Sequence, residues 1–325
     1  MTNFNSLTER GKIQRYRRVL TQALVEYPIK VQAIRFISNT SKPVFRVHTG
    51  AGSYAAKFHN PAEHTLAQMA SELCFLDYVS SHSDMRIEIP LANSRGDFIT
   101  ELQSTWLPAT AHVALCSWVP GVALKSYISA SAYRHLGRCA AMLHKASASF
   151  RPGQTFSILT NNKVFYWDKE TVLTKQDRKL LPRQRQDLFC QGARVAQRAI
   201  TEVWKSGQPR VIHNDLHPCN LKVQRGKLSM YDFEDITWGF PQQDIGTAMF
   251  HVCSRSDYPD LLCAFQEGYR KVLSWPLESD RQLDHFVIAR VLMFANYVLN
   301  FDLDPSKFLP QYESMLEILL NGKAS

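Results

Sequence analysis

Hydrophobic and polar residues follow two different periods in the first part of the chain. Between residues 13 and 24, apolar side chains recur at helical spacing, which predicts an amphipathic helix. Three short runs with strand-type composition follow at residues 31–37, 44–49 and 53–59. Polar or glycine-containing turns separate them, so we expect an antiparallel sheet.

The pattern then becomes mainly helical. A helix is expected from about Pro61 to residue 79, because proline is well tolerated in a first turn. An apolar strand at residues 112–119 ends at a Pro-Gly break, and helical patterns dominate beyond it. Two strand-like pieces interrupt them, with Arg225-Gly226 as the turn. We therefore predict an α+β, bilobal fold: an N-terminal lobe over 1–115, a hinge over 116–121 and a helical C-terminal lobe over 122–325.

Composition agrees with a globular protein of this size. The 325 residues are many for one core, 45% are hydrophobic and 21% charged, and no apolar run is long enough to span a membrane. Seven cysteines lie far apart without a C-x-x-C pair, which indicates reduced thiols and a cytoplasmic protein.

Net charge is +9, which raises the possibility of nucleic-acid binding. Between residues 175 and 210 there are nine basic and three acidic residues, so this stretch alone carries 9 − 3 = +6. Aromatic residues for base stacking are sparse in it. A solvated helical face is the better interpretation, and no nucleic-acid partner is expected.

The segment VIHNDLHPCN, residues 211–220, allows two kinds of chemistry. In a strand, His213, Asp215 and His217 would point the same way and could hold zinc. Pro218 ends a regular strand, however, and no second histidine cluster is near in the sequence. The metal hypothesis is therefore the weaker one.

The alternative is a phosphoryl-transfer loop with the pattern H-x-D-x-x-x-x-N, which fits from His213 to Asn220. In such loops the Asp accepts the proton of the acceptor hydroxyl and the Asn holds magnesium. A second magnesium ligand should follow on a short hairpin, and Asp232 of a D-F pair lies twelve residues after Asn220.

The same scheme requires a lysine on an N-terminal strand and a glutamate on the next helix. Lys57 lies in an apolar strand, where an unpaired charge is costly. Glu72 follows fifteen residues later, whereas Glu63 is expected in the first helical turn, where capping explains it better. Because all these parts occur in the required order, the phosphate interpretation is preferred.

With these motifs the chain resembles the aminoglycoside phosphotransferase and choline kinase superfamily, which has a protein-kinase-like fold, from about residue 28 to residue 300. LGRCAAMLHKAS is similar to its helix ending in Leu-His, and FYWD to a frequent Trp-Asp element. DFEDITWGFPQQDIGTAMF looks most like the branch that contains homoserine kinase type II and the bacterial stress-response kinase.

The resemblance implies ATP and Mg²⁺ as cofactors and a role for each matching residue. Asp215 would be the catalytic base, and Asn220 and Asp232 would be ligands of the magnesium ion. Lys57 would reach the α- and β-phosphates and pair with Glu72. In the hinge, the backbone around Cys116 and Trp118 would hydrogen-bond to adenine. Asp244 would brace the catalytic loop, His213 would pack beneath that loop, and His217 would be a spacer.

One segment departs from the family pattern. The phosphate-covering loop is usually rich in glycine, but Ser38–Pro43 has none. Side chains such as Ser41 and Lys42 would have to contact the phosphates instead. This leaves open a nucleotide-binding regulator that does not transfer phosphate.

The acceptor is expected to be a small hydroxylated molecule, such as an aminoglycoside, an amino alcohol or a homoserine-like compound. Only twelve residues separate Asp232 from Asp244, and no A-P-E follows to support a peptide. A Ser/Thr protein kinase of the stress-response type remains the alternative. The candidate acceptor-pocket residues are Glu234, Asp235, Glu267 and Arg290, although Arg290 could equally form a buried ion pair.

Overall fold

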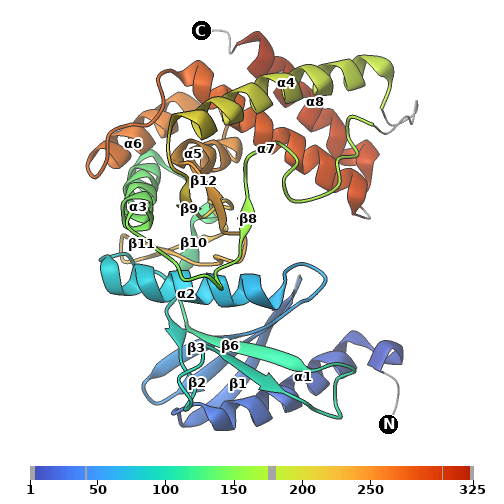
Figure 1. Ribbon diagram of the computed structural model, residues 1–325, viewed down its shortest axis with the longest axis vertical. Coiled ribbons are helices and arrows are strands. Elements are labelled where there is room, and N and C mark those ends of the chain that lie inside the picture. Colours follow the sequence, from blue (N-terminus) through green and yellow to red (C-terminus); the bar gives the residue numbers. More distant parts are fainter. Residues whose placement is uncertain (1–3, 41, 175–180, 302, 323–325) are drawn as a thin grey trace. The chain divides into compact units, whose positions relative to one another are not determined.

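The structure is a computed structural model that describes residues 4–40, 42–174, 181–301 and 303–322 (Figure 1). The chain divides into two compact units, and each is continuous in space but not in sequence. The first contains residues 1–121, 152–157 and 229–234, and the second contains 122–151, 158–228 and 235–325.

The first unit is an antiparallel sheet with a helix on each face (Figure 1). Its elements are α1 (Glu9–Ala23), β1 (Val31–Asn39), β2 (Pro43–Thr49), β3 (Gly52–Phe58), α2 (Leu66–His82), β4 (Pro90–Leu91), β5 (Ile99–Leu102) and β6 (Ala111–Ser117), with 3-10 turns at Phe4–Ser6 and Leu24–Glu26. The sheet order is β1-β2-β3-β6-β4, and β5 also pairs with β6. Helix α1 buries Val19 and Leu20 in a core with Phe45 and Val113.

Helix α2 begins later than the sequence pattern predicts. Pro61 and Glu63 lie in a turn, and the helix begins at Leu66 after the N-cap Thr65. The Thr65 hydroxyl accepts the Gln68 N–H at 3.2 Å, while the Gln68 side chain accepts the Thr65 N–H at 2.7 Å. This capping box satisfies two backbone N–H groups, and the Pro61 side chain has no polar atom that could do the same. The capping box therefore decides where the helix starts.

The second unit is mainly helical. Its elements are β7 (Val122–Ala123), a 3-10 turn (Leu124–Ser126), α3 (Ala130–Ala148), β8 (Leu159–Thr160), α4 (Arg183–Ser206), β9 (Arg210–Ile212), β10 (Leu221–Gln224), β12 (Thr237–Gly239), α5 (Pro241–Phe250), α6 (Tyr258–Arg270), α7 (Asp280–Asn300) and α8 (Pro305–Asn321). Strand β11 (Lys227–Met230) pairs with β10 and leads into the first unit. Arg225 and Gly226 both have positive φ, 51° and 72°, as a tight hairpin turn requires.

Helices α3 and α6 pack with their backbones almost in contact. A Cβ on Gly137 would lie 2.0 Å from the Phe265 carbonyl oxygen, and one on Gly268 would lie 1.8 Å from that of Arg134. Only glycine permits this approach. The pair fixes α6 on α3, the helix that carries His144.

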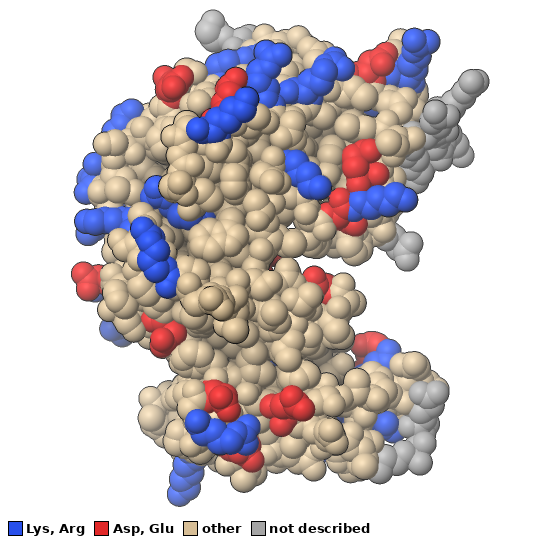
Figure 2. Space-filling view, viewed as in Figure 1, with Lys and Arg blue, Asp and Glu red and all other residues tan. Residues whose placement is uncertain are grey.

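These elements confirm the expected α+β class, with an antiparallel sheet near the N-terminus and helices beyond it. Helix α4 covers most of the basic stretch, and Figure 2 shows Lys and Arg side chains gathered over it. Within the described ranges, every helix is too short or too polar to cross a bilayer.

Candidate active site

The loop after β9 is held by a single buried carboxylate on α5. Asp244 is fully buried and accepts the backbone N–H of His213 at 2.9 Å and that of Asn214 at 2.6 Å. Its third neighbour is His144 Nε2, which lies 3.0 Å from Asp244 Oδ2. Asn214 has φ = 67°, a left-handed conformation that asparagine tolerates better than most residues. The loop therefore turns sharply just before Asp215, in the way expected if Asp244 braces it.

Three side chains surround the Asp215 carboxylate. Asn220 Nδ2 donates to Oδ2 at 2.7 Å, and His217 Nε2 lies 3.0 Å from the same oxygen. Arg290, on α7, donates through Nη2 to Oδ1. Burial by itself would raise the pKa of the Asp215 carboxyl, but the His217 hydrogen bond and the Arg290 guanidinium outweigh it and hold the pKa well below its ordinary value. Asp215 is thus an oriented, ionised carboxylate.

His217 is a neighbour of Asp215 and more than the spacer that the sequence suggested. Its Nδ1 accepts the Cys219 N–H at 3.1 Å, which leaves Nε2 as the nitrogen that carries the proton toward Asp215. The His217 ring lies 4.8 Å from the ring of His251. Burial lowers the pKa of the His251 imidazole to about 3, so His251 is neutral.

The first unit holds the lysine and its carboxylates. Lys57 Nζ, on β3, lies 3.4 Å from Glu72 Oε1 on α2 and 2.8 Å from Glu88 Oε1. Glu88 also accepts the backbone N–H of Asp232 at 2.8 Å. Burial alone would lower the pKa of the Lys57 ammonium, but Glu88 and Glu72 outweigh it and hold the pKa well above its usual value. Lys57 is therefore a buried permanent cation, linked through Glu88 to Asp232.

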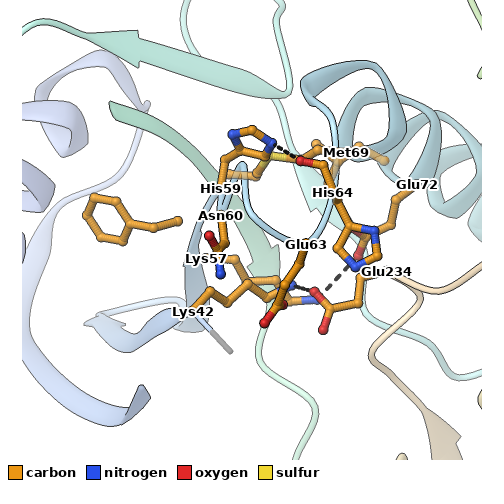
Figure 3. Close-up of a pocket in the computed structure, with 12 residues that line it drawn as sticks. Lys42, Lys57, His59, Asn60, Glu63, His64, Met69, Glu72 and Glu234 are labelled. Carbon is orange, nitrogen blue, oxygen red and sulfur yellow. Dashed lines mark hydrogen bonds and ion pairs between the residues drawn. The ribbon is translucent and has the colours of Figure 1, made fainter. Parts of the chain in front are cut away.

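A pocket of about 430 Å³, with open solvent included, lies beside this lysine (Figure 3). Lys42 pairs with Glu234 in it, and Lys57 and Glu72 line the same space. Glu63, His64 and Glu234 offer ligand atoms within 4.8 Å of one another, so they could hold a cation. Burial, with the nearby Lys42, lowers the pKa of His64 to about 4, which keeps its ring neutral.

The backbone of the expected hinge makes contacts within the first unit, and its adenine-binding role stays a prediction. Cys116 is buried in β6, opposite Ala55 of β3. The Trp118 N–H donates to the Ser53 carbonyl at 2.9 Å, so this amide is already used within the unit. Ser41, expected to contact the phosphates, lies outside the described residues.

The candidate acceptor residues are divided between the two units. Glu267 is on α6 and forms a surface ion pair with Arg134 at 2.7 Å, and its expected pocket role stays a prediction. Glu234 faces Lys42 in the first unit, and the Asp235 carbonyl accepts from Asn214 Nδ2 at 3.1 Å in the second. Arg290 forms the buried ion pair that the sequence left as an alternative.

The zinc hypothesis fails on geometry. Across the described ranges, His213, Asp215 and His217 do not form a cluster of metal ligands, because the histidine next to Asp215 donates to it instead of turning toward a shared ion. The assignment of Asn220 and Asp232 to magnesium stays a prediction. Asn220, in the second unit, would offer its carbonyl oxygen because its amide nitrogen donates to Asp215, and Asp232, in the first unit, would offer a carboxylate.

Two neighbours of the key residues were missed by sequence reasoning. The sequence does contain a signal for Glu88. It is an acidic residue between Ile87 and Ile89, and a carboxylate buried in an apolar segment needs a partner. His217 was considered but given no contact with Asp215. Its role depends on the turn of the loop, which residue spacing alone does not fix.

Comparison with known proteins shows which family the chain matches. Residues 33–279 match the family described as "Phosphotransferase enzyme family". A curated relative, amicoumacin kinase from Bacillus subtilis (strain 168), is 21% identical over 245 residues, which cover 74% of this chain and 69% of the relative. The expected superfamily is thereby confirmed, while the branch within it stays a prediction.

Two solved structures share the fold over nearly the whole chain. A microcompartment-associated aminopropanol kinase superposes with a TM-score of 0.74 at 20% identity, covering 92% of this chain and 95% of that one. Amicoumacin kinase hAmiN, in complex with AMP-PNP, Ca²⁺ and Ami, superposes with a TM-score of 0.73 at 16% identity, covering 95% and 96%. The protein-kinase-like fold expected from the sequence is confirmed.

Proposed function

This chain belongs to the phosphotransferase enzyme family, and from that premise we propose that it moves the γ-phosphate of ATP to a hydroxyl group of a small molecule, with Asp215 as the base. The observation that carries the proposal is the Asp215 carboxylate itself. It is ionised, it is oriented by Asn220 and His217, and it lies on a loop that Asp244 braces.

In the reaction, the acceptor hydroxyl oxygen bonds to the γ-phosphorus while the bond from that phosphorus to the β–γ bridging oxygen breaks and ADP leaves. The hydroxyl proton passes to a carboxylate oxygen of Asp215, which later returns it to solvent. Positioning is the main contribution of Asp215, because a loose transition state needs little basic help. Lys57, fixed by Glu72 and Glu88, supplies positive charge for the α- and β-phosphates.

In this proposal Asn220 and Asp232 would supply oxygen ligands for the divalent cation. A magnesium ion held by them would neutralise charge on the transferred phosphoryl group. The pocket beside Lys57 supports nucleotide binding, since Lys42 could exchange Glu234 for a phosphate oxygen. This exchange gives the glycine-free loop a way to contact phosphate through a side chain.

The test is ADP release from magnesium–ATP with a panel of amino alcohols, hydroxy amino acids, choline and aminoglycosides. Asp215→Asn should lower the rate by about 10²-fold or more while nucleotide still raises the melting temperature. Asp260→Asn, an exposed carboxylate on α6, is the matched control and should be fully active.

Other results would redirect the proposal. Labelling of proteins in a lysate, with no small acceptor, would favour the protein-kinase alternative. Magnesium–ATP binding without ADP under any acceptor would favour a non-catalytic regulator. Equal activity of Asp215→Asn and the native enzyme would reject Asp215 as the base.

A further inference from the structure

Arg290, on α7, contacts the carboxylate of Asp215, the proposed catalytic base. Its side chain is only 8% exposed. Nη2 donates to Asp215 Oδ1, Nη1 donates to the Asn214 carbonyl at 3.3 Å, and the guanidinium lies 4.9 Å from the ring centre of Phe294. The cation is therefore held over the catalytic loop from α7.

One donor of this guanidinium is not used. Arg290 Nε is buried and has no hydrogen-bond partner among the residues that the structure describes. A buried donor without a partner is costly, and native proteins seldom leave one unless a ligand or water completes it. Nε and Nη2 form the edge of the guanidinium that matches the two oxygens of a carboxylate.

Arg290 also lines a pocket in the second unit. This pocket measures about 340 Å³ with open solvent included, and Tyr166, Asn214, Thr247 and Met293 line it too. The Tyr166 hydroxyl accepts from Asn214 Nδ2, and burial raises the pKa of Tyr166 to about 12, so the phenol stays neutral. The pocket thus presents one cation, neutral polar groups and apolar walls.

The same contact blocks the catalytic carboxylate. Oδ1 of Asp215 accepts from Arg290, while Oδ2 accepts from Asn220 and His217. An acceptor hydroxyl needs one of these oxygens to take its proton. Of the three residues that donate to Asp215, Arg290 is the one with a further buried donor, Nε, that has no partner among the described residues, so a ligand that pairs with Nε can draw the guanidinium away from Asp215 without breaking the loop.

Building on the proposed function, we propose that the phosphate acceptor carries a carboxylate, which binds the Nε–Nη2 edge of Arg290 and frees Asp215 Oδ1 for the acceptor hydroxyl. Arg290 is then an acceptor-binding residue that determines specificity. An ammonium group in the same place would meet the guanidinium with like charge. A carboxylate replaces the Asp215 contact with a bidentate one, so the arginine never loses its anionic partner.

Matched acceptor pairs test this directly. L-threonine and 1-amino-2-propanol, L-homoserine and 3-amino-1-propanol, and L-serine and ethanolamine differ only by the carboxylate. For whichever pair is phosphorylated, kcat/KM should favour the amino acid by about 10²-fold or more, because a site built to pair with a group rejects the analogue that lacks it. Arg290→Lys keeps the charge but lacks the two-donor edge, and it should collapse this ratio toward one.

A binding measurement gives an answer that does not depend on turnover. The Nε–H resonance of Arg290 is identified by its loss in Arg290→Lys and followed in the enzyme loaded with magnesium and a non-hydrolysable ATP analogue. Adding the preferred amino acid should shift it, whereas adding the matching amino alcohol should not. Ethylphosphonate and acetate serve as probes of other anions and of the carboxylate alone.

The outcomes separate this inference from the proposed function. Equal turnover within each pair, preference for the amino alcohols, or Asp215-dependent turnover of an aminoglycoside alone would overturn the carboxylate acceptor and leave the phosphotransferase standing. An Nε–H signal that moves with neither member of any pair would assign the edge to structural water and overturn it as well. Failure of every acceptor, with Asp215→Asn indistinguishable from the native enzyme, would count against the phosphotransferase proposal itself.

Discussion

Glu88 Oε1 lies 2.8 Å from Lys57 Nζ, closer than Glu72 at 3.4 Å, so the buried lysine has two carboxylate partners. Glu88 also accepts the Asp232 backbone N–H at 2.8 Å. One carboxylate therefore fixes both the lysine proposed to hold the nucleotide phosphates and the segment that carries a proposed magnesium ligand.

Replacing Glu88 should lower both the activity and the stability of the protein. Glu88→Gln weakens the pairing of Lys57 and changes the hydrogen bond to Asp232. We expect kcat/KM for ATP to fall by roughly 10–100-fold and stability to fall by about 1–3 kcal/mol. Steady-state kinetics and urea unfolding measure the two effects. Glu101→Gln, an exposed glutamate on β5 of the same sheet, is the control, and matching behaviour of the two variants would contradict the prediction.

Asp244 should be important for both folding and rate. Asp244→Asn keeps the size but turns an N–H donor toward a region that already contains the His213, Asn214 and His144 donors. The expected loss of stability is about 2–4 kcal/mol, because buried donors lose their acceptor. Denaturant unfolding measures it, and kcat should fall as the loop moves. A loss no larger than that of the surface variant Asp260→Asn would show that Asp244 does not brace the loop.

Acid should destabilise the protein through His251. Its pKa falls from 6.5 to about 3 on folding, so below pH 6.5 the unfolded chain binds a proton that the folded protein excludes. Stability is then lost as the pH drops from 6.5 toward 3, and none of this contribution is lost above 6.5. At about pH 5 the loss is on the order of 2 kcal/mol.

The His251 contribution is measured as a difference between variants. Unfolding free energies of the native protein and His251→Gln are compared between about pH 7 and about pH 5, and the variant should lose less. His135→Gln, an exposed histidine on α3, should keep the native pH dependence. Parallel curves for the native protein and His251→Gln would show that His251 is not held neutral.

The contact between α3 and α6 should not tolerate a methyl group. Gly137→Ala places a Cβ 2.0 Å from the Phe265 carbonyl oxygen, where backbone must move. Overpacking of this kind costs about 1–3 kcal/mol. Thermal or urea unfolding tests this against Gly153→Ala, where a Cβ meets nothing within 4 Å and stability should stay within about 0.5 kcal/mol.

Local patterns gave the elements and the order of the motifs. Helix α1 and strands β1 to β3 fall where the hydrophobic periods place them, because side-chain period and turn residues act over a few positions. The start of α2 was misplaced by five residues, from Pro61 to Leu66. A proline permits a helix start, but the Thr65–Gln68 capping box stabilises one, and the stronger local signal decided.

Some of the candidate residues could not be judged from spacing. Glu267 looked suitable for a pocket because it is acidic and follows the D-F element, yet it pairs with Arg134 on the surface. Burial and partner choice depend on how α6 lies on α3. The glycines Gly137 and Gly268 set that packing. Gly268 directly follows Glu267, but its partner glycine lies on α3, far earlier in the chain, so local spacing does not show the contact.

The sequence by itself determined the family, the kind of enzyme and the loop that carries Asp215, because these follow from residue types at short, fixed separations. Tertiary structure decided which side chains meet across long separations. Glu88 reaches Lys57 over 31 residues, and Arg290 reaches Asp215 over 75. Charges buried at such positions must find partners from whatever elements pack beside them, so the packing of whole helices and strands selects the partners that tune this site.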